Sequence, residues 1–508
     1  MLNNNIDKVN LEETMNRSSG VLMHISSLPG KYGIGTFGRE ARAFADFLRE
    51  ARQQYWQILP LGPTSYGDSP YQSPSAFAIN PHFIDLDLLC EEGLLQPEDY
   101  QFINFGDDLS KVDYNLISVN KDAVLRKAYA AGAAGMSADI RIFTELHQQW
   151  LPDYALFMAV KSHFQFREWR FWEEDIKKRV PEAMSYYSEN YGEEIKYHQF
   201  LQYIAYKQWN SLKDYIHRQG IQIIGDIPIY TSGDSADTWA NASAGIFKYD
   251  QDLTPLCVAG CPPDYFSEDG QYWGNTVYDW EKNKATGFQW WIRRLESALT
   301  IYDWVRIDHF RGLESYWEVP YGSPSAACGS WKPGPGSEFI DTIKNALGDV
   351  KIIAEDLGMM TDSVREFVKK SGFPNMKVLG FAFDSCGDND HLPHHYDKNC
   401  VVYTGTHDND TVMGWFDKAG DDAAAFAKEY LKLDQEEGYH WGMIRGALSS
   451  VANLAVIPMQ DLLELGSEAR MNIPSTLGGN NWRWRMTWEA VPQELTGRLE
   501  KLTRLYGR

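Results

Sequence analysis

The chain has 508 residues and a formal net charge of −22 at pH 7, with 44% hydrophobic and 14% aromatic residues. The acidic balance argues against nucleic acid and anionic membrane surfaces as partners, because phosphate groups require a basic face. The first 20 residues are polar and no apolar run approaches the length of a membrane span, so we expect a cytoplasmic protein.

Short apolar runs recur along the chain, and each ends in a polar or Gly/Pro-rich segment. Most of them alternate with helical patterns, which is typical of a parallel sheet covered on both faces. Eight such runs predict an α/β fold, a closed (β/α)8 TIM barrel. The runs are 20–25, 55–61, 221–227, 302–307, 350–355, 376–383, 400–405 and 453–459.

Two helices of the outer ring can be predicted in detail. Apolar residues at helical spacing between residues 41 and 51 indicate a helix with one buried face after the first strand. Ser363 and Glu366 have the spacing of a capping box, and Gly372 followed by Pro374 marks a helix end. This second helix falls between the fifth and sixth strands.

The spacing of the strands is uneven, and this predicts insertions into one catalytic unit that spans 1–508. Residues 64–215, between the second and third strands, are expected to form a mostly helical subdomain. Residues 228–300 are expected to form a loop region whose "CPPDYFSEDGQYWGN" is a candidate lid on the acceptor side. We expect all six cysteines to be thiols, since "CVAGC" has no second pair at zinc-finger spacing.

Charged residues gather where four of the predicted strands end, the edge at which barrel enzymes carry their chemistry. A single Asp after a strand is usually a helix N-cap, but residues from four strands with Arg and His among them are harder to explain that way. A metal site is one alternative, although Arg306 would repel a cation and no HExxH or EF-hand spacing occurs. These strand-end residues are Asp226, Arg306, Asp308, Glu355, Asp356, His407 and Asp408.

Glycoside chemistry fits this set better, because it needs one ionised carboxylate as nucleophile and one protonated carboxylic acid. Arg306 and Asp308 share a strand face, so we expect the cation to keep Asp308 ionised. Glu355 follows an apolar strand and suits the acid. The many Trp and Tyr residues beside Gly, Asn and Asp would suit sugar rings, although most of them must serve the core.

Several motifs closely resemble the bacterial 4-alpha-glucanotransferases, also called amylomaltases or disproportionating enzymes, of glycoside hydrolase family 77 in the α-amylase-like superfamily. The resemblance runs from "HISSLPGKYGIGTFG" to "NWRWRM" and so covers almost the whole chain. The motifs that carry it are "GDSPYQSPSAFAINP", "PPDYFSEDGQYWGN", "RIDHFRG", "AEDLG", "GTHDN" and "GSEARMNIPSTLGGNNWRWR".

The resemblance implies a retaining double displacement on α-1,4-glucans and maltooligosaccharides, with glucose as an acceptor, and a barrel without a C-terminal β-domain. By motif position Asp308 is the nucleophile, Glu355 the general acid/base and Asp408 the third carboxylate. No metal or organic cofactor is implied. The resemblance also assigns substrate contacts: Tyr71, Asp226, Arg306 and His407 at the reacting glucose, Ser69 and Asn472 on the donor side, Trp273 on the acceptor side, and Tyr66 at a second, remote glucan site.

Two alternatives stay open at this point. A hydrolase of the same superfamily would share the three carboxylates but release free reducing ends. A catalytically inactive glucan-binding protein is the non-enzyme alternative, and the presence of Asp308, Glu355 and Asp408 weighs against it.

Overall fold

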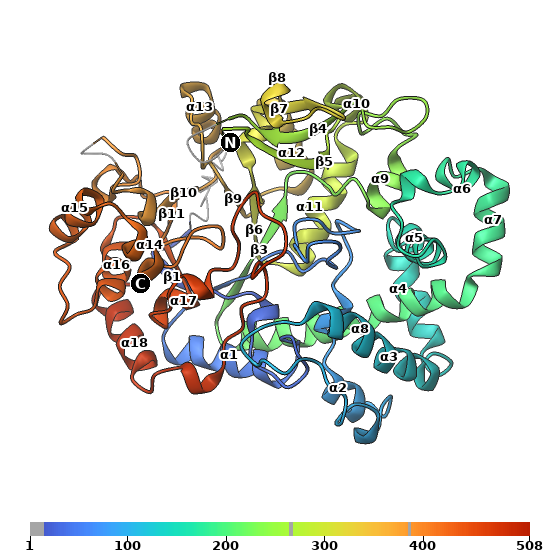
Figure 1. Cartoon of the computed structure of the whole chain (residues 1–508), viewed down its shortest axis with the longest axis horizontal. Helices are drawn as coiled ribbons and strands as arrows, with labels where there is room; N and C mark the ends of the chain where they lie inside the picture. The colour runs from blue at the N-terminus through green and yellow to red at the C-terminus, as the bar shows by residue number, and fades with distance from the viewer. Residues whose placement is uncertain (1–14, 264–267, 385–387) are drawn as a thin grey trace, which may run out of the picture.

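A computed structural model describes residues 15–263, 268–384 and 388–508. Eight parallel strands close into a barrel in the order β1-β12-β11-β10-β9-β6-β3-β2, with β1 paired to β12 (Figure 1). This confirms the predicted (β/α)8 barrel. The barrel strands are β1 (Ser18–Leu22), β2 (Tyr55–Gln57), β3 (Gln222–Pro228), β6 (Trp304–Asp308), β9 (Ile352–Ala354), β10 (Asn375–Val378), β11 (Cys400–Tyr403) and β12 (Leu454–Pro458).

Each predicted apolar run overlaps a barrel strand, but three of the runs leave the sheet well before their predicted ends: 20–25 after Leu22, 55–61 after Gln57 and 376–383 after Val378. After β2 the backbone N–H of Leu59 donates to His24 Nδ1 (3.2 Å) and that of Leu61 donates to the Tyr302 hydroxyl (3.1 Å). Because these bonds go to side chains rather than to a neighbouring strand, the strand has ended. The sixth run leaves the sheet after Val378 and turns through a 3-10 helix, Leu379–Phe381.

The helices lie mainly around the barrel. They are α1 (Arg39–Glu50), α2 (Leu86–Glu91), α3 (Tyr114–Gly132), α4 (Ser137–Leu146), α5 (Leu151–His163), α6 (Glu174–Lys177), α7 (Pro181–Asn190), α8 (Gly192–Arg218), α9 (Ala236–Asn241), α10 (Trp280–Ala285), α11 (Gln289–Ile301), α12 (Gly336–Leu347), α13 (Asp362–Ser371), α14 (Val412–Lys418), α15 (Asp421–Leu431), α16 (Tyr439–Ser449), α17 (Met459–Leu462) and α18 (Leu495–Leu505).

The two predicted helices are present as α1 and α13. Helix α1 buries Ala41, Phe44 and Leu48 on one face. Helix α13 ends as predicted at Gly372, in the left-handed conformation (φ 73°) that favours glycine. The predicted capping box is wrong, because the cap is Thr361, whose hydroxyl accepts from the Val364 N–H (3.4 Å).

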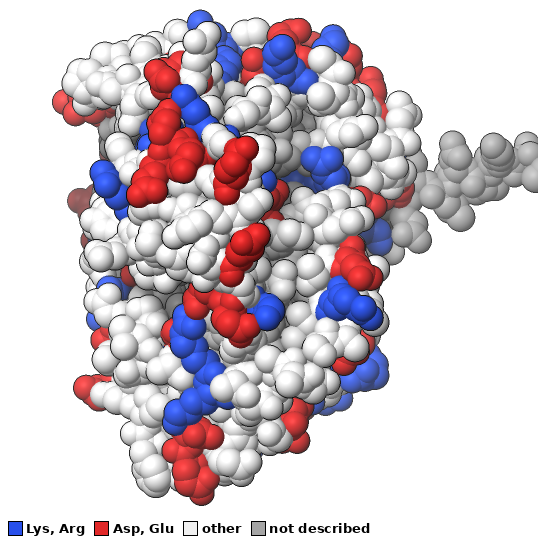
Figure 2. All heavy atoms as spheres, turned by 90° about the vertical axis from the view of Figure 1, so that its right-hand side faces the viewer, with Lys and Arg blue, Asp and Glu red and all other residues white. Residues whose placement is uncertain are grey.

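The segment between β2 and β3 contains the helices α2 to α8, most of which occupy the right-hand side of Figure 1. Two buried glutamines of α8 fix it to the chain that follows β2. Gln202 exchanges two hydrogen bonds with the backbone of Ile79 (2.9 and 2.8 Å), and Gln208 does the same with Asp85 (2.7 and 3.1 Å). Figure 2 shows this side, where acidic and basic side chains are interspersed with large uncharged areas.

A second sheet lies at the top of Figure 1, beside the barrel. It has the order β5-β4-β7-β8 and is antiparallel. Its strands are β4 (Cys257–Cys261), β5 (Gln271–Thr276), β7 (Ser315–Pro320) and β8 (Ser330–Pro333). The prediction of a loop region at 228–300 is therefore wrong over β4 and β5, and also over the helices α9, α10 and α11. Residues 264–267 of the candidate lid lie outside the described residues.

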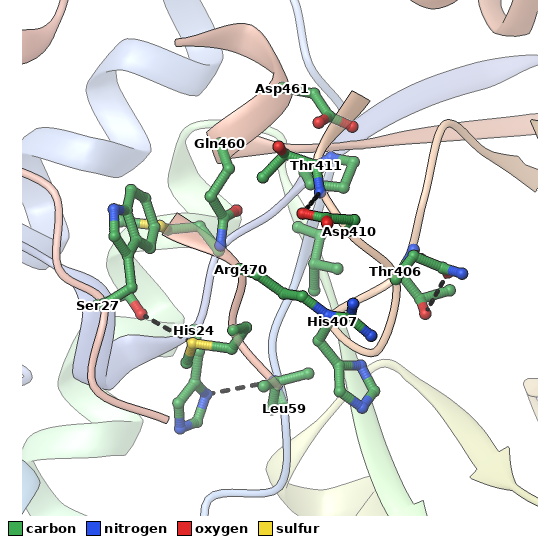
Figure 3. Close-up of a pocket in the computed structure, with 16 residues that line it drawn as sticks. His24, Ser27, Leu59, Thr406, His407, Asp410, Thr411, Gln460, Asp461 and Arg470 are labelled. Carbon is green, nitrogen blue, oxygen red and sulfur yellow. Dashed lines mark hydrogen bonds between the residues drawn. The ribbon is translucent and has the colours of Figure 1, made fainter. Parts of the chain in front are cut away.

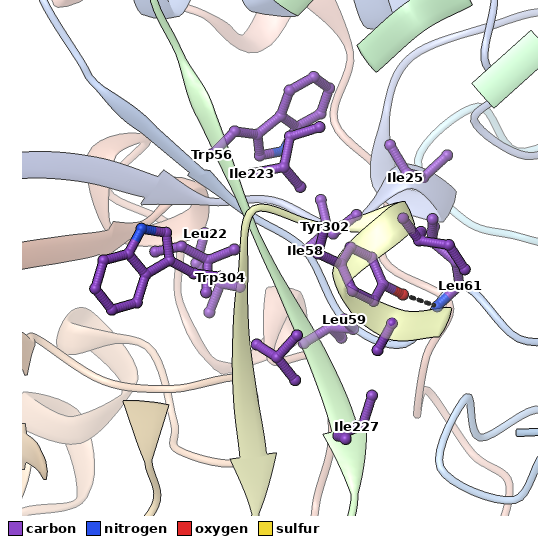
Figure 4. Close-up of a cluster of buried hydrophobic side chains, with 14 of the residues drawn as sticks. Leu22, Ile25, Trp56, Ile58, Leu59, Leu61, Ile223, Ile227, Tyr302 and Trp304 are labelled. Atoms are coloured by element: carbon purple, nitrogen blue, oxygen red, sulfur yellow. Dashed lines mark hydrogen bonds between the residues drawn. The ribbon is translucent and has the colours of Figure 1, made fainter. Parts of the chain in front are cut away.

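The core is continuous from the barrel interior to the helices around it. Figure 4 shows part of it, where side chains of β1 to β3 and β6 pack together and the Tyr302 hydroxyl meets the Leu61 N–H. The five described cysteines are thiols, and Cys386 lies outside the described residues. Within the described ranges, no helix has both the length and the apolar character needed to cross a bilayer.

Candidate active site

Arg306 lies at the centre of the site, at the carboxyl end of the barrel strands, and is 2% exposed. Its guanidinium contacts carboxylates from three strands. The distances are 2.5 Å to Asp226 Oδ2, 3.1 Å to Asp308 Oδ1 and 2.8 Å to Glu355 Oε2. Strand alternation places Arg306 and Asp308 on one face of β6, and the parallel neighbours β3 and β9 bring Asp226 and Glu355 beside them.

The protonation of this cluster differs from the sequence-based expectation. Burial, followed by the charge of Glu355, raises the pKa of Asp308 well above its ordinary value despite Arg306. Burial also opposes ionisation of Glu355, but Arg306 and the His309 N–H outweigh it and lower the pKa of that carboxyl. One cation shared among three carboxyls that are buried or partly buried cannot keep all of them ionised. Of the two interacting carboxyls, the raised pKa is therefore that of Asp308, where we expected it to be that of Glu355.

His309 connects the end of β6, which carries Asp308, to Glu355. Its backbone has the left-handed conformation (φ 53°), and this turn directs its N–H to Glu355 Oε2 at 2.6 Å. Its ring packs edge-on against Trp273 of β5, with centroids 4.9 Å apart. The second sheet therefore reaches the carboxylate cluster through Trp273.

The loop after β11 carries His407 and Asp408. Asn472 donates from its side chain to Asp408 Oδ1 (2.6 Å), and its backbone N–H donates to the His407 carbonyl (3.0 Å). Arg470 donates to the Asp408 carbonyl (2.5 Å) and to the Asn472 carbonyl (2.7 Å). Figure 3 shows Arg470 extending toward His407 in the pocket beside this loop. Arg470 thus holds the Asp408 segment to the one that carries Asn472, a role that the sequence did not predict.

Tyr71 closes the other side of the site. Its hydroxyl donates to Asp226 Oδ2 (2.8 Å), and its ring stacks on His407 with centroids 5.2 Å apart and planes at 15°. Burial raises the pKa of Asp226, against the effect of Arg306. Trp482 contacts both rings, at 5.7 Å from Tyr71 and 5.9 Å from His407. The aromatic "NWRWR" motif was the only signal for Trp482.

The remaining predicted residues lie away from the carboxylates. The Ser69 hydroxyl accepts from the Tyr71 N–H (3.3 Å), so Ser69 shapes the turn before Tyr71. Tyr66 is 86% exposed. Asp356 faces the sheet, where it accepts from the Met376 N–H (2.9 Å) and the Asn375 side chain (3.1 Å). Within the described part of the chain, no group of three or more His, Cys, Asp or Glu is placed to hold a metal ion.

Two carboxyls whose pKa values are shifted in opposite directions beside one guanidinium can support nucleophilic attack and proton transfer in one site. A further carboxylate, Asp408, lies 3.3 Å from His407 Nε2 and is 39% exposed at its side chain. Aromatic rings border the site on both sides, at Tyr71 and Trp273. Such a combination suits a neutral ligand that has apolar faces and hydroxyl groups.

Comparisons with known proteins agree on one family. A family model described as 4-alpha-glucanotransferase matches residues 23–491. A 4-alpha-glucanotransferase of Clostridium butyricum is 53% identical over 96% of this chain and 100% of its own, and one of Thermus thermophilus is 45% identical over 94% and 96%. The amylomaltase of Streptococcus agalactiae, solved in complex with acarbose, superposes with a TM-score of 0.95 at 44% identity, covering 97% of this chain and 99% of its own.

Proposed function

Because the chain belongs to the 4-alpha-glucanotransferase family, we propose that it transfers α-1,4-glucan segments by a retaining double displacement through a covalent ester on Asp308. The donor is a maltooligosaccharide and the acceptor is the 4-hydroxyl of another glucan or of glucose. The whole chain acts as one catalytic unit, with insertions at 64–215 and 228–300, in a cytoplasmic setting.

The observation that carries the mechanism is that Asp308 and Glu355 contact the same guanidinium, that of Arg306, at 3.1 and 2.8 Å. Asp308 and Glu355 are close enough for a side-chain hydrogen bond. Retaining enzymes hold their two carboxyls roughly 5–5.5 Å apart, whereas inverting enzymes leave room for a water at about 6.5–9.5 Å. The short separation supports direct attack by a carboxylate.

Substrate binding must first move a proton from Asp308 to Glu355. A bound glucan brings its electron-poor anomeric carbon to Asp308 and its glycosidic oxygen to Glu355. The first contact favours the ionised form of Asp308, and the proton passes along the carboxyl hydrogen bond to Glu355. Glu355 then protonates the glycosidic oxygen while Asp308 attacks, and the fragment that carries the reducing end leaves.

In the second half-reaction Glu355, now ionised, removes the proton from the 4-hydroxyl of the acceptor, and the sugar leaves Asp308. Asp408 stabilises the charge on the ring in both steps. The reacting glucose lies among Tyr71, Asp226, Arg306 and His407; Ser69 and Asn472 lie on the donor side, Trp273 is on the acceptor side, and Tyr66 holds a second stretch of glucan. Transfer exceeds hydrolysis if the acceptor at Trp273 excludes water.

The test is incubation of the pure protein with maltotriose, following the product ladder and the total number of reducing ends. We expect longer maltooligosaccharides and glucose with constant reducing ends. A steady rise in reducing ends would identify a hydrolase instead. No change in the presence of several donor lengths would leave a binding protein as the better description.

A further inference from the structure

The second sheet carries aromatic side chains in one line across its strands. Tyr272 of β5 is the register partner of Gly260 in β4, Gly260 is the partner of Trp317 in β7, and Trp317 is the partner of Trp331 in β8. Residues directly opposite one another in antiparallel strands point to the same face. Tyr272, Trp317 and Trp331, here called the aromatic row, therefore share one face of the sheet.

The row meets solvent at both ends. Tyr272 is 43% exposed and Trp331 is 37% exposed, while Trp317 between them is half-buried. Large aromatic side chains left in water on one sheet face are unfavourable without a ligand or partner, and such patches mark binding sites in many proteins. The usual explanation of sheet aromatics, packing in a core, does not apply to the exposed parts of these rings.

Neighbouring groups hold the two indoles in place. The Trp317 ring donates from Nε1 to the Ala326 carbonyl (2.8 Å), and its centroid lies 5.3 Å from that of Trp331 at an angle of 72°. The buried Arg311 guanidinium lies 4.2 Å from the Trp331 centroid. Because these contacts already fix the rings, a ligand would bind them without a large ordering cost.

The row adjoins the active site but faces away from it. Trp273 follows Tyr272 in β5, points to the opposite face and packs against His309. Arg311, which supports Trp331, also donates to the Met359 carbonyl on the loop after Glu355. A glucan chain longer than the active site can hold would therefore find the row on the reverse side of the same sheet.

We propose that Tyr272, Trp317 and Trp331 form a further binding surface for α-1,4-glucan chains, separate from the cleft around Asp308 and from Tyr66. Sugars present apolar ring faces and a rim of hydroxyls, which match aromatic faces set at an angle to one another. The guanidinium of Arg311 is buried beneath Trp331, so its charge is not exposed at that ring. This suits a neutral binding partner. The inference rests on the proposed function, since it takes the substrate to be a polymer.

Native gel electrophoresis through glycogen tests the proposal. The full-length protein should be retarded, and Trp331→Ala and Tyr272→Ala should each weaken the dissociation constant for glycogen by roughly three- to tenfold, in the range that one aromatic contact supplies. Phe171→Ala is the matched control, because Phe171 is an aromatic residue that is 53% exposed in the helical insertion. It should migrate as the parent protein does.

Unchanged retardation of both row variants, or an equal loss in the Phe171 control, would overturn the proposal. So would a concentration-dependent dimer in sedimentation that Trp331→Ala abolishes while glycogen binding persists, because the row would then pair two copies of the chain. Near-ultraviolet circular dichroism and thermal midpoints establish that the variants fold. Disproportionation of maltotriose by the parent protein is measured in a separate assay. If the parent protein shows no transfer, the proposed reaction is wrong, whereas the glycogen gels still report whether the aromatic row binds glucan.

Discussion

Thr404 donates its hydroxyl hydrogen to Asp461 at 2.5 Å, from the end of β11 to the short helix after β12. The second oxygen of the same carboxylate accepts from the Val412 N–H at 2.8 Å, at the start of α14. One buried side chain therefore holds both ends of the loop that carries His407 and Asp408. Figure 3 shows Asp461 at the edge of the pocket beside this loop.

Asp461→Asn should change how stability depends on pH. Burial raises the pKa of Asp461 to about 6, from an ordinary value of 3.8. The stability linked to its protonation is complete below about pH 4 and is lost as the pH rises through about 6. Asparagine does not titrate, so the stability of the parent relative to the variant should fall by on the order of 2–3 kcal/mol between pH 4 and pH 7.5.

Urea unfolding of both proteins at the two pH values measures this difference. A difference that stays constant with pH would show that Asp461 does not titrate in this range. The same variant should also lower turnover, because asparagine leaves Thr404 or Val412 without an acceptor at one end of the Asp408 loop.

Asp308→Asn should abolish transfer and leave glucan binding largely intact. Asparagine has nearly the shape of aspartate, and the pKa of Asp308 is already raised, so the neutral side chain should let the variant fold normally, yet its amide cannot attack an anomeric carbon. Maltotriose turnover and calorimetric titration with maltooligosaccharides measure the two properties. Retained turnover would contradict the assignment of Asp308 as nucleophile.

Glu355→Gln should reduce turnover by about 10²- to 10⁴-fold or more, because proton transfer is lost from both half-reactions. The glutamine oxygen can still accept from the His309 N–H, so glucan affinity should change little. Glu314→Gln is the control, on the segment that follows His309, where Glu314 accepts from the Ser315 hydroxyl. Equal losses in the two variants would point to a general electrostatic effect rather than to acid/base catalysis.

Thr361→Ala should destabilise the protein by about 1 kcal/mol, since it removes the hydroxyl that caps α13. Ser363→Ala should cost less than about 0.5 kcal/mol, the usual range for a surface position, because the Ser363 hydroxyl bonds to that of Thr361 rather than to the helix backbone. Thermal midpoints of the two variants compare the two caps directly. The opposite order would restore the capping box predicted from the sequence.

The barrel could be predicted because each of its strands is a short apolar run, and such runs require burial on both faces. The second sheet could not be predicted in this way. β5 reads "QYWGNT" and β8 reads "SWKP", which contain Gly, Asn and Pro and lack an apolar repeat. Pairing with strands distant in the sequence stabilises these segments, and local sequence does not record that pairing.

Sequence analysis predicted those residues of the site that lie at the ends of barrel strands. Asp226, Arg306, Asp308 and Glu355 follow from the rule that barrel strands present their last residues at one edge. Arg470 and Trp482 come from irregular chain after α17 and reach the site only through the tertiary fold. The raised pKa of Asp308 was also missed, because neighbours in sequence do not reveal that Arg306 is shared with Asp226 and Glu355.

The pairing of β1 with β12 also has a consequence during synthesis. Ser18 pairs with Leu454, so roughly 430 residues must be made before the first strand gains its last neighbour, and at about 5–20 residues per second this takes about 20–90 s. For that interval one edge of β1 lacks its barrel partner and can pair with other extended chains. Slower translation of the final third of the chain should therefore lower the yield of active protein through aggregation.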